Sequence, residues 1–152
     1  MSLEDNAEYL MGLIPRLQHW VTVDDLQHLR RGGRVSGAQA FLGSLLSVKP
    51  ILTVNHLGQL VPCHKTRGRA KSLEYLADRV VEYMDEPEDQ LIAISHSDAA
   101  EDAKTLRDLI NEKCGKHDFL IHHIGPVVGV HTGPGAIALM FLAKERLKVE
   151  KK

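Results

Sequence analysis

Residues 51–64, ILTVNHLGQLVPCH, place two β-rich runs on either side of a polar, glycine-containing tetrapeptide. The runs are 51–54 and 59–64, and a short polar segment between two such runs predicts a β-hairpin. A hairpin pairs its strands in antiparallel fashion, which excludes an all-parallel sheet. We therefore expect a mixed or largely antiparallel sheet.

Strand and helix patterns alternate after the hairpin, and helices packed on a mixed sheet make an α/β fold. Residues 127–142 fit either two strands joined at 132–135 or a glycine-rich turn followed by a helix. The alternation of Ile137, Leu139 and Phe141 favours strands. The elements before this segment are, in order, a helix through 73–84, a strand at 91–95, a helix from an Asp98–Glu101 capping box to Cys114-Gly115, and a strand at 119–124.

The N-terminal third predicts three helices and one strand. We expect 1–17 to be a helix or linker remnant, in which Met1–Leu3 could be a cloning remnant, and 18–150 to form the folded domain. The elements are a helix at 4–17, a strand at 19–24, a short helix around Leu26 and Leu29 that stops at Gly32-Gly33, and a helix that opens at Ser36 and ends at Pro50.

The composition excludes several classes of protein. Nineteen basic residues nearly balance twenty acidic residues, for a net charge of -1, so no overall charge favours nucleic acid or an anionic membrane. No apolar run approaches the roughly 20 residues that a transmembrane helix needs. Two cysteines are too few for a disulfide framework, and no signal peptide is visible, so we expect a cytoplasmic protein with reduced thiols.

An arginine- and glycine-rich stretch, Arg30-Arg31-Gly32-Gly33-Arg34, precedes the helix expected at Ser36. Glycines let a backbone approach a ligand closely, and a helix N-terminus attracts anions. Arg34 can clamp a carboxylate or a phosphate with two hydrogen bonds. The alternative is a helix that ends in glycine and carries solvated arginines.

A second basic cluster, Lys65-Thr66-Arg67-Gly68-Arg69, lies where a strand passes into a helix. Its arginines can meet an acidic partner or a phosphate. They can equally lie in a solvated loop, because runs of surface charge are common.

A third stretch, residues 125–135 (GPVVGVHTGPG), surrounds one histidine and one threonine with four glycines and two prolines. His131 can donate a hydrogen bond to a carboxylate or relay a proton, and Thr132 adds a hydroxyl group. The stretch matches neither a dinucleotide-binding nor a P-loop motif. A tight turn with a buried, hydrogen-bonded histidine is the alternative.

The remaining histidines and serines form no recognised metal or catalytic motif. No Cys-x-x-Cys or His-Glu-x-x-His occurs, and the adjacent His122 and His123 point to opposite faces if they lie in a strand. Residues 95–98 (SHSD) hold the residue types of a catalytic triad, but triads are assembled by the fold from separated positions. A strand end followed by a helix cap explains these four residues better. We therefore predict no metal and no catalytic residue.

Together, these stretches resemble the C-terminal half of the DegV family over about residues 20–143. Each motif alone is weak, whereas their order and spacing are specific. The matching segments are Val23-Asp24-Asp25-Leu26 to Leu29, Arg31 to Ser36 (RGGRVS), the helix into Lys49-Pro50-Ile51-Leu52, Arg67-Gly68-Arg69, and 124–135 (IGPVVGVHTGPG).

The resemblance implies a non-catalytic protein of two α/β lobes that buries a long-chain fatty acid and uses no cofactor. In such proteins the carboxylate is presented to a separate kinase subunit, which makes an acyl phosphate. Family members carry an N-terminal lobe whose Ser and Thr residues bond the carboxylate, and the match here begins almost at residue 18. We therefore expect an excised C-terminal domain, with half of the head-group site missing and an exposed apolar patch that promotes self-association.

The resemblance also implies roles for individual residues. Arg34 matches the family arginine near the carboxylate, and His131 matches the family histidine, with Thr132 beside it. Arg67 and Arg69 resemble a basic segment that meets the kinase or the phosphoryl group. The backbone is expected to approach the ligand at Gly32, Gly33, Gly133 and Gly135.

Two other functions remain open from the residues alone. One is an enzyme domain in which Arg34, Arg67 and His131 bind a nucleotide or a sugar phosphate. The other is a pure interaction domain. A fatty acid that co-purifies with the protein would favour lipid binding, whereas a bound nucleotide would favour the phosphate site.

Overall fold

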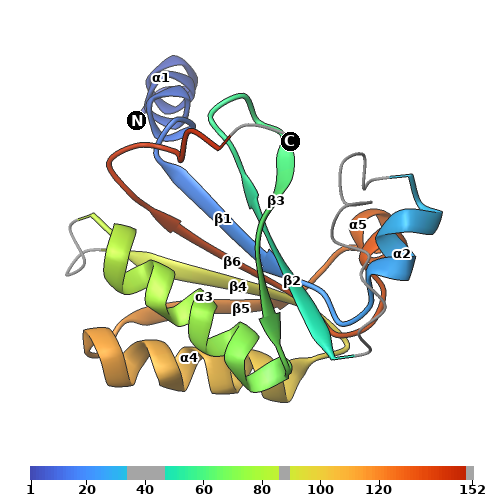
Figure 1. Cartoon of the computed structure of the whole chain (residues 1–152). Coiled ribbons are helices and arrows are strands. Elements are labelled where there is room, and N and C mark those ends of the chain that lie inside the picture. The colour runs from blue at the N-terminus through green and yellow to red at the C-terminus, as the bar shows by residue number, and fades with distance from the viewer. Residues whose placement is uncertain (34–46, 86–89, 150–152) are drawn as a thin grey trace.

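The computed structural model describes residues 1–33, 47–85 and 90–149, and Figure 1 shows its arrangement. None of the helices in these ranges has the length and hydropathy of a membrane span. The elements are, in chain order, α1 (Leu3–Leu13), β1 (Leu17–Thr22), α2 (Leu26–Arg31), β2 (Val48–Val54), β3 (Leu60–Arg67), α3 (Arg69–Tyr83), β4 (Leu91–Ser97), α4 (Ala100–Cys114), β5 (Asp118–His123), α5 (Pro126–Thr132) and β6 (Ala136–Leu142).

The six strands form one mixed sheet with the order β3-β2-β1-β6-β4-β5. Four of its neighbouring pairs are antiparallel, and β4 pairs with β5 in parallel. The hairpin expected at 51–64 is the β2–β3 pair. The predicted α/β fold with a mixed, largely antiparallel sheet is confirmed.

One face of the sheet lies under α3 and α4, which Figure 1 shows side by side. Strand side chains alternate between the two faces, so every second residue of β1, β4 and β6 enters this core. A fully buried Leu or Ile stabilises the fold by about 1.5–3 kcal/mol relative to exposure, which makes this layer the main source of stability. Its buried members include Trp20, Ile94, Leu139 and Phe141 from the strands and Leu76, Val80, Leu106 and Ile110 from the helices.

The opposite face of the sheet is less completely covered. Leu120, Ala93, Met140 and His19 form one row across four strands. Leu120 is 54% exposed, and the other three side chains are half-buried. At one end of this face, Leu52 and Val21 pack with α2 residues instead. The sheet therefore has one densely packed face and one partly open apolar face.

The segment expected to pair as two strands between 127 and 142 contains a helix and a strand. Pro126 occupies the first turn of α5, where its missing N–H leaves no hydrogen bond unmade. Gly133 ends this helix with a φ of 73°, a backbone conformation that favours glycine. The expectation of a strand is therefore correct for Ile137–Phe141 and wrong for residues 127–132.

The capping box expected at the start of α4 does not form. Asp98 has a φ of 48°, and the residue that caps the helix, Ala99, makes no side-chain capping bond. The Ala99 N–H donates instead to Nδ1 of His96, at 3.3 Å. A histidine at the end of β4 therefore satisfies one of the free N–H groups that precede the helix.

Two boundaries near the N-terminus also differ from those predicted. The first helix ends at Leu13, because the chain meets Pro15 and then enters β1 at Leu17. Pro50 lies inside β2 and pairs with Lys65, next to a bulge between Ile51 and Leu52. The helix expected from Ser36 lies mostly in 34–46, outside the described residues.

Candidate functional site

Most of the residues predicted from the sequence to bind a ligand lie at one edge of the sheet, formed by one end of each strand. The registers place Thr22 opposite Ile137, and Ser97 opposite Ala136. The last residues of β1, β3, β4 and β5 therefore lie at the same edge as the first residues of β2 and β6. In Figure 1, α2 and α5 lie side by side beyond this edge. The arginine–glycine stretch and the H-T-G-P-G segment thus meet although they are far apart in the sequence.

Gly32 and His131 provide the direct contact between these two segments. A Cβ atom built on Gly32 would lie 2.4 Å from Nδ1 of His131, closer than real side chains approach. The His131 ring therefore occupies the space that a side chain at position 32 would need. Arg34, two residues further on, lies outside the described residues, so its convergence with His131 stays a prediction.

Two further glycines are approached just as closely. A Cβ on Gly133 would lie 2.5 Å from the His28 ring, and one on Gly135 would lie 2.6 Å from Cβ of Asp24. Both glycines also have positive φ, of 73° and 80°. Gly33 has a φ of 67°, and apart from its chain neighbours none of the described residues lies within 4 Å of the position of a Cβ there. The atoms that approach three of the four predicted glycines therefore belong to side chains of this chain, and approach by a ligand stays a prediction.

Thr132 is 7% exposed, and its hydroxyl group is used within its own helix. Its Oγ1 donates to the carbonyl oxygen of Val128 at 3.2 Å and lies 3.5 Å from that of Gly129. This back-bonding is typical of threonine in a helix. Thr132 can donate to a carboxylate only if its hydroxyl group rotates away from these carbonyls.

The two arginines at the junction between β3 and α3 have different surroundings. Arg67 ends the strand and is exposed. Arg69 begins α3, and its Nε and Nη2 each lie 2.8 Å from Oδ2 of Asp102 in the first turn of α4. Arg69 therefore links two helices, and Arg67 is the more accessible of these two arginines.

Histidines at the ends of β4 and β5 were not predicted as part of the site. His96 is 5% exposed, and the centroid of its ring lies 4.6 Å from that of His123. Burial, and then the positive potential of His123 when charged, lower the pKa of His96. No local sequence pattern predicts this pair, because it is the parallel register of β4 and β5 that places His96 beside His123. In the part of the chain that the structure describes, no three His, Cys, Asp or Glu side chains form a metal site.

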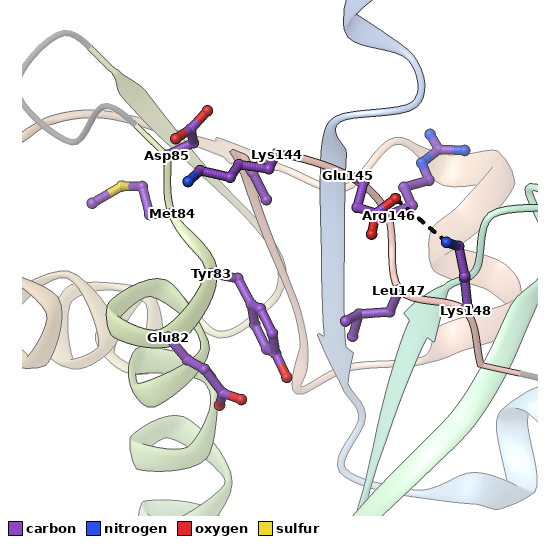
Figure 2. Close-up of a pocket in the computed structure, with 10 residues that line it drawn as sticks. Glu82, Tyr83, Met84, Asp85, Lys144, Glu145, Arg146, Leu147 and Lys148 are labelled. Atoms are coloured by element: carbon purple, nitrogen blue, oxygen red, sulfur yellow. Dashed lines mark ion pairs between the residues drawn. The ribbon is translucent and has the colours of Figure 1, made fainter.

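A hollow with a volume of about 630 Å³ lies at the opposite end of the strands (Figure 2). The end of α3 and the segment 143–148 line it, and Figure 2 shows Tyr83 and Leu147 facing each other across it. Its charges are partly paired, since Nζ of Lys148 lies 3.7 Å from the carboxylate of Glu145. None of the residues predicted to bind a ligand lines this hollow.

Comparison with known proteins gives consistent matches. A family model described as "Uncharacterised protein, DegV family" matches residues 1–144. A DegV domain-containing protein of Clostridium perfringens is 49% identical over 127 residues, which are 84% of this chain and 44% of that protein.

Solved structures agree with the fold. The crystal structure of a fatty acid binding DegV family protein from Streptococcus agalactiae is 35% identical, with a TM-score of 0.79, over 95% of this chain and 51% of that one. The fatty acid kinase B3 protein of Streptococcus pneumoniae, loaded with linoleic acid, is 18% identical with a TM-score of 0.81, over 95% and 50% of the two chains, and shows the fold alone. The chain spans about half the length of these relatives. Because the family model covers nearly all of its residues, the chain belongs to the DegV family.

Proposed function

We propose that this chain binds a long-chain fatty acid and holds its carboxylate at the sheet edge where α2 meets α5. The contact between Gly32 and His131 carries the proposal, because it joins the two segments that the family resemblance assigns to the head group. The relative from S. agalactiae is described as a fatty acid binding protein, which supports the same class of ligand.

The head group needs a partner once the acyl chain is buried, because an unpaired buried carboxylate is very unfavourable. His131 is half-buried at the end of α5, so its ring is partly shielded from water but still accessible to a ligand. Arg34 follows the Gly32-Gly33 turn and supplies the permanent positive charge. Together, the guanidinium and imidazole groups bind one carboxylate, and Thr132 contributes when its hydroxyl group turns outward.

The acyl chain lies along the partly open face of the sheet. Leu120, Ala93 and Met140, three members of the row across this face, are apolar and incompletely covered by the described helices. Burying about 14 methylene groups at ~0.8 kcal/mol each gives a gross stabilisation on the order of 10 kcal/mol. A second lobe, of the size that the longer relatives have, would cover this face and complete the head-group site. Without that lobe, the same face promotes association between copies of the chain.

The bound carboxylate is then presented to a separate kinase subunit that forms the acyl phosphate. This step follows from the family resemblance, and the fold shared with the S. pneumoniae protein is compatible with it. In this proposal the chain is a non-catalytic, cytoplasmic binding subunit that uses no cofactor. Arg67 is exposed beyond the same sheet edge, so it meets the kinase or the phosphoryl group, and Arg69 stabilises the adjacent helices through Asp102.

Native mass spectrometry of the purified protein, followed by lipid extraction, tests the proposal. We expect a long-chain fatty acid to be released, and Arg34→Ala and His131→Ala each to weaken oleate binding at least about tenfold, since a hydrogen bond to a charged group contributes ~1.5–3 kcal/mol. Arg107→Ala is the matched control, because that guanidinium pairs with the neighbouring Asp108 on α4. A bound nucleotide with no lipid would support the phosphate-binding alternative and overturn this one.

A further inference from the structure

Three contacts form a ladder between the α2 segment and the H-T-G-P-G segment. Asp24 meets Gly135, His28 meets Gly133, and Gly32 meets His131. In the α2 segment, Asp24, His28 and Gly32 are four positions apart, which places His28 and Gly32 on the same face of α2 and its C-terminal end. In the H-T-G-P-G segment, their partners are two positions apart, and the two segments run in opposite directions. Each rung pairs a glycine with a side chain.

In each rung, the glycine position has no room for an added carbon atom. The three hypothetical Cβ positions lie 2.4–2.6 Å from the facing side chain, well inside van der Waals contact. If the α2 segment slid along the H-T-G-P-G segment, each side chain would leave its glycine and collide with the facing backbone. Because the glycine changes sides between the second and third rungs, a single register satisfies all three contacts.

Both sides of the ladder are tied to the sheet. Nζ of Lys49, at the start of β2, lies 2.5 Å from Oδ1 of Asp24 and 3.0 Å from its carbonyl oxygen. The N–H of Gly135 donates to the carbonyl oxygen of Ser97, at the end of β4, over 2.7 Å. The outer rung is thus anchored to two strands.

We propose that His28, which lies outside both the arginine–glycine stretch and the H-T-G-P-G segment, is a positioning residue that sets His131 against the Gly32-Gly33 turn. This inference rests on the proposed function, because it concerns the same head-group site. His28 acts through shape: its ring fills the space beside Gly133, directly after His131 and Thr132 in the chain. With the ring removed, α5 is free to shift on α2, and the imidazole of His131 loses its fixed place beside Gly32.

The test compares three variants of the chain by the imidazole 1H–13C signal of His131, assigned from its loss in His131→Ala, and by oleate affinity. His28→Ala should shift or broaden that signal and weaken oleate binding about tenfold, an effect of ~1.4 kcal/mol. His28→Phe keeps a planar ring without a titratable group and should preserve both. His56→Ala, an exposed histidine in the β2–β3 turn at the other end of the strands, is the control and should change neither.

The outcomes separate this inference from the proposed function. An unchanged His131 signal in His28→Ala overturns the positioning role, whatever the oleate affinity. If His28→Ala does not fold, His28→Phe decides, since a displaced His131 signal in that folded variant would refute a role based on ring shape. If wild-type chain binds no oleate but His28→Ala moves the His131 signal and His28→Phe restores it, the positioning role stands and the proposed ligand is wrong.

Discussion

The core beneath α3 and α4 is packed differently from the joint between α2 and α5, which consists of the three glycine contacts described above. In the core, side chains meet side chains, and residues such as Leu76 and Leu139 have no exposed surface. In the joint, glycines meet side chains, and an added carbon at Gly32 would lie 2.4 Å from the His131 ring. The core is therefore sensitive to lost volume, and the joint to gained volume. One small domain thus combines a core that depends on filled volume with a joint that depends on close fit.

Loss of volume in the core should give the largest effect. Leu76→Ala removes a fully buried side chain between α3 and the sheet, so we expect the free energy of unfolding to fall by about 2–5 kcal/mol. Urea denaturation followed by circular dichroism measures this change. Leu91→Ala removes the same atoms from a side chain that is 57% exposed and should cost much less. Equal losses in the two variants would contradict the proposed division between core and surface.

Gain of volume in the joint should give the next largest effect. Gly32→Ala should destabilise the chain by ~1–3 kcal/mol, because the new methyl group collides with the His131 ring. This glycine, unlike Gly133, has no positive φ, so the collision is not confounded by backbone strain. His131→Ala should relieve the collision, and a double-mutant cycle should show a coupling energy of about 0.5–3 kcal/mol. Strictly additive losses would mean that the two residues do not touch.

The contrast between these regions also explains what the sequence could predict. The hairpin at 51–64 and the helix α3 follow local periodicity, so their existence was predictable. Helix α5 was not, since its β-branched Val127, Val128 and Val130 favour a strand, yet they are 55–79% exposed, and Pro126 and Gly133 set the ends of the helix. The glycines themselves were predictable as sites of close approach. The identity of the side chains that pack against them depends on contacts between distant segments, and no local pattern encodes these contacts.

A change of pH should affect the joint through the strand end beside it. Nδ1 of His96 accepts the Ala99 N–H, and it cannot do so once it carries a proton. Burial and His123 lower the pKa of His96 from the usual 6.5, with His122 acting in the same direction and Asp98 opposing them. The unfolded chain therefore binds this proton at a higher pH than the folded chain does. The stabilisation is complete above pH 6.5 and is lost as the pH falls through the pKa of the folded state.

Denaturation midpoints between pH 8 and pH 5 measure this dependence. His96→Gln removes the titrating group, so its stability should fall less than that of wild type as the solution is acidified. His19 also has a pKa lowered by burial and by Arg146, so His19→Gln determines its share of the effect. If wild type and His96→Gln lost stability in parallel, protonation of His96 would play no part.

The ion pair between Arg69 and Asp102 should have the smallest effect, because it depends on neither volume nor close fit. The Arg69 and Asp102 side chains keep 19% and 36% of their surface exposed, so water and salt screen their attraction. Arg69→Ala should therefore lower the free energy of unfolding by no more than about 1 kcal/mol, and less at high salt. If a kinase or phosphate contacts Arg67 alone, Arg69→Ala should preserve that interaction while Arg67→Ala abolishes it. A loss of several kcal/mol in Arg69→Ala would instead place this pair with the core, as a buried contact on which the helices depend.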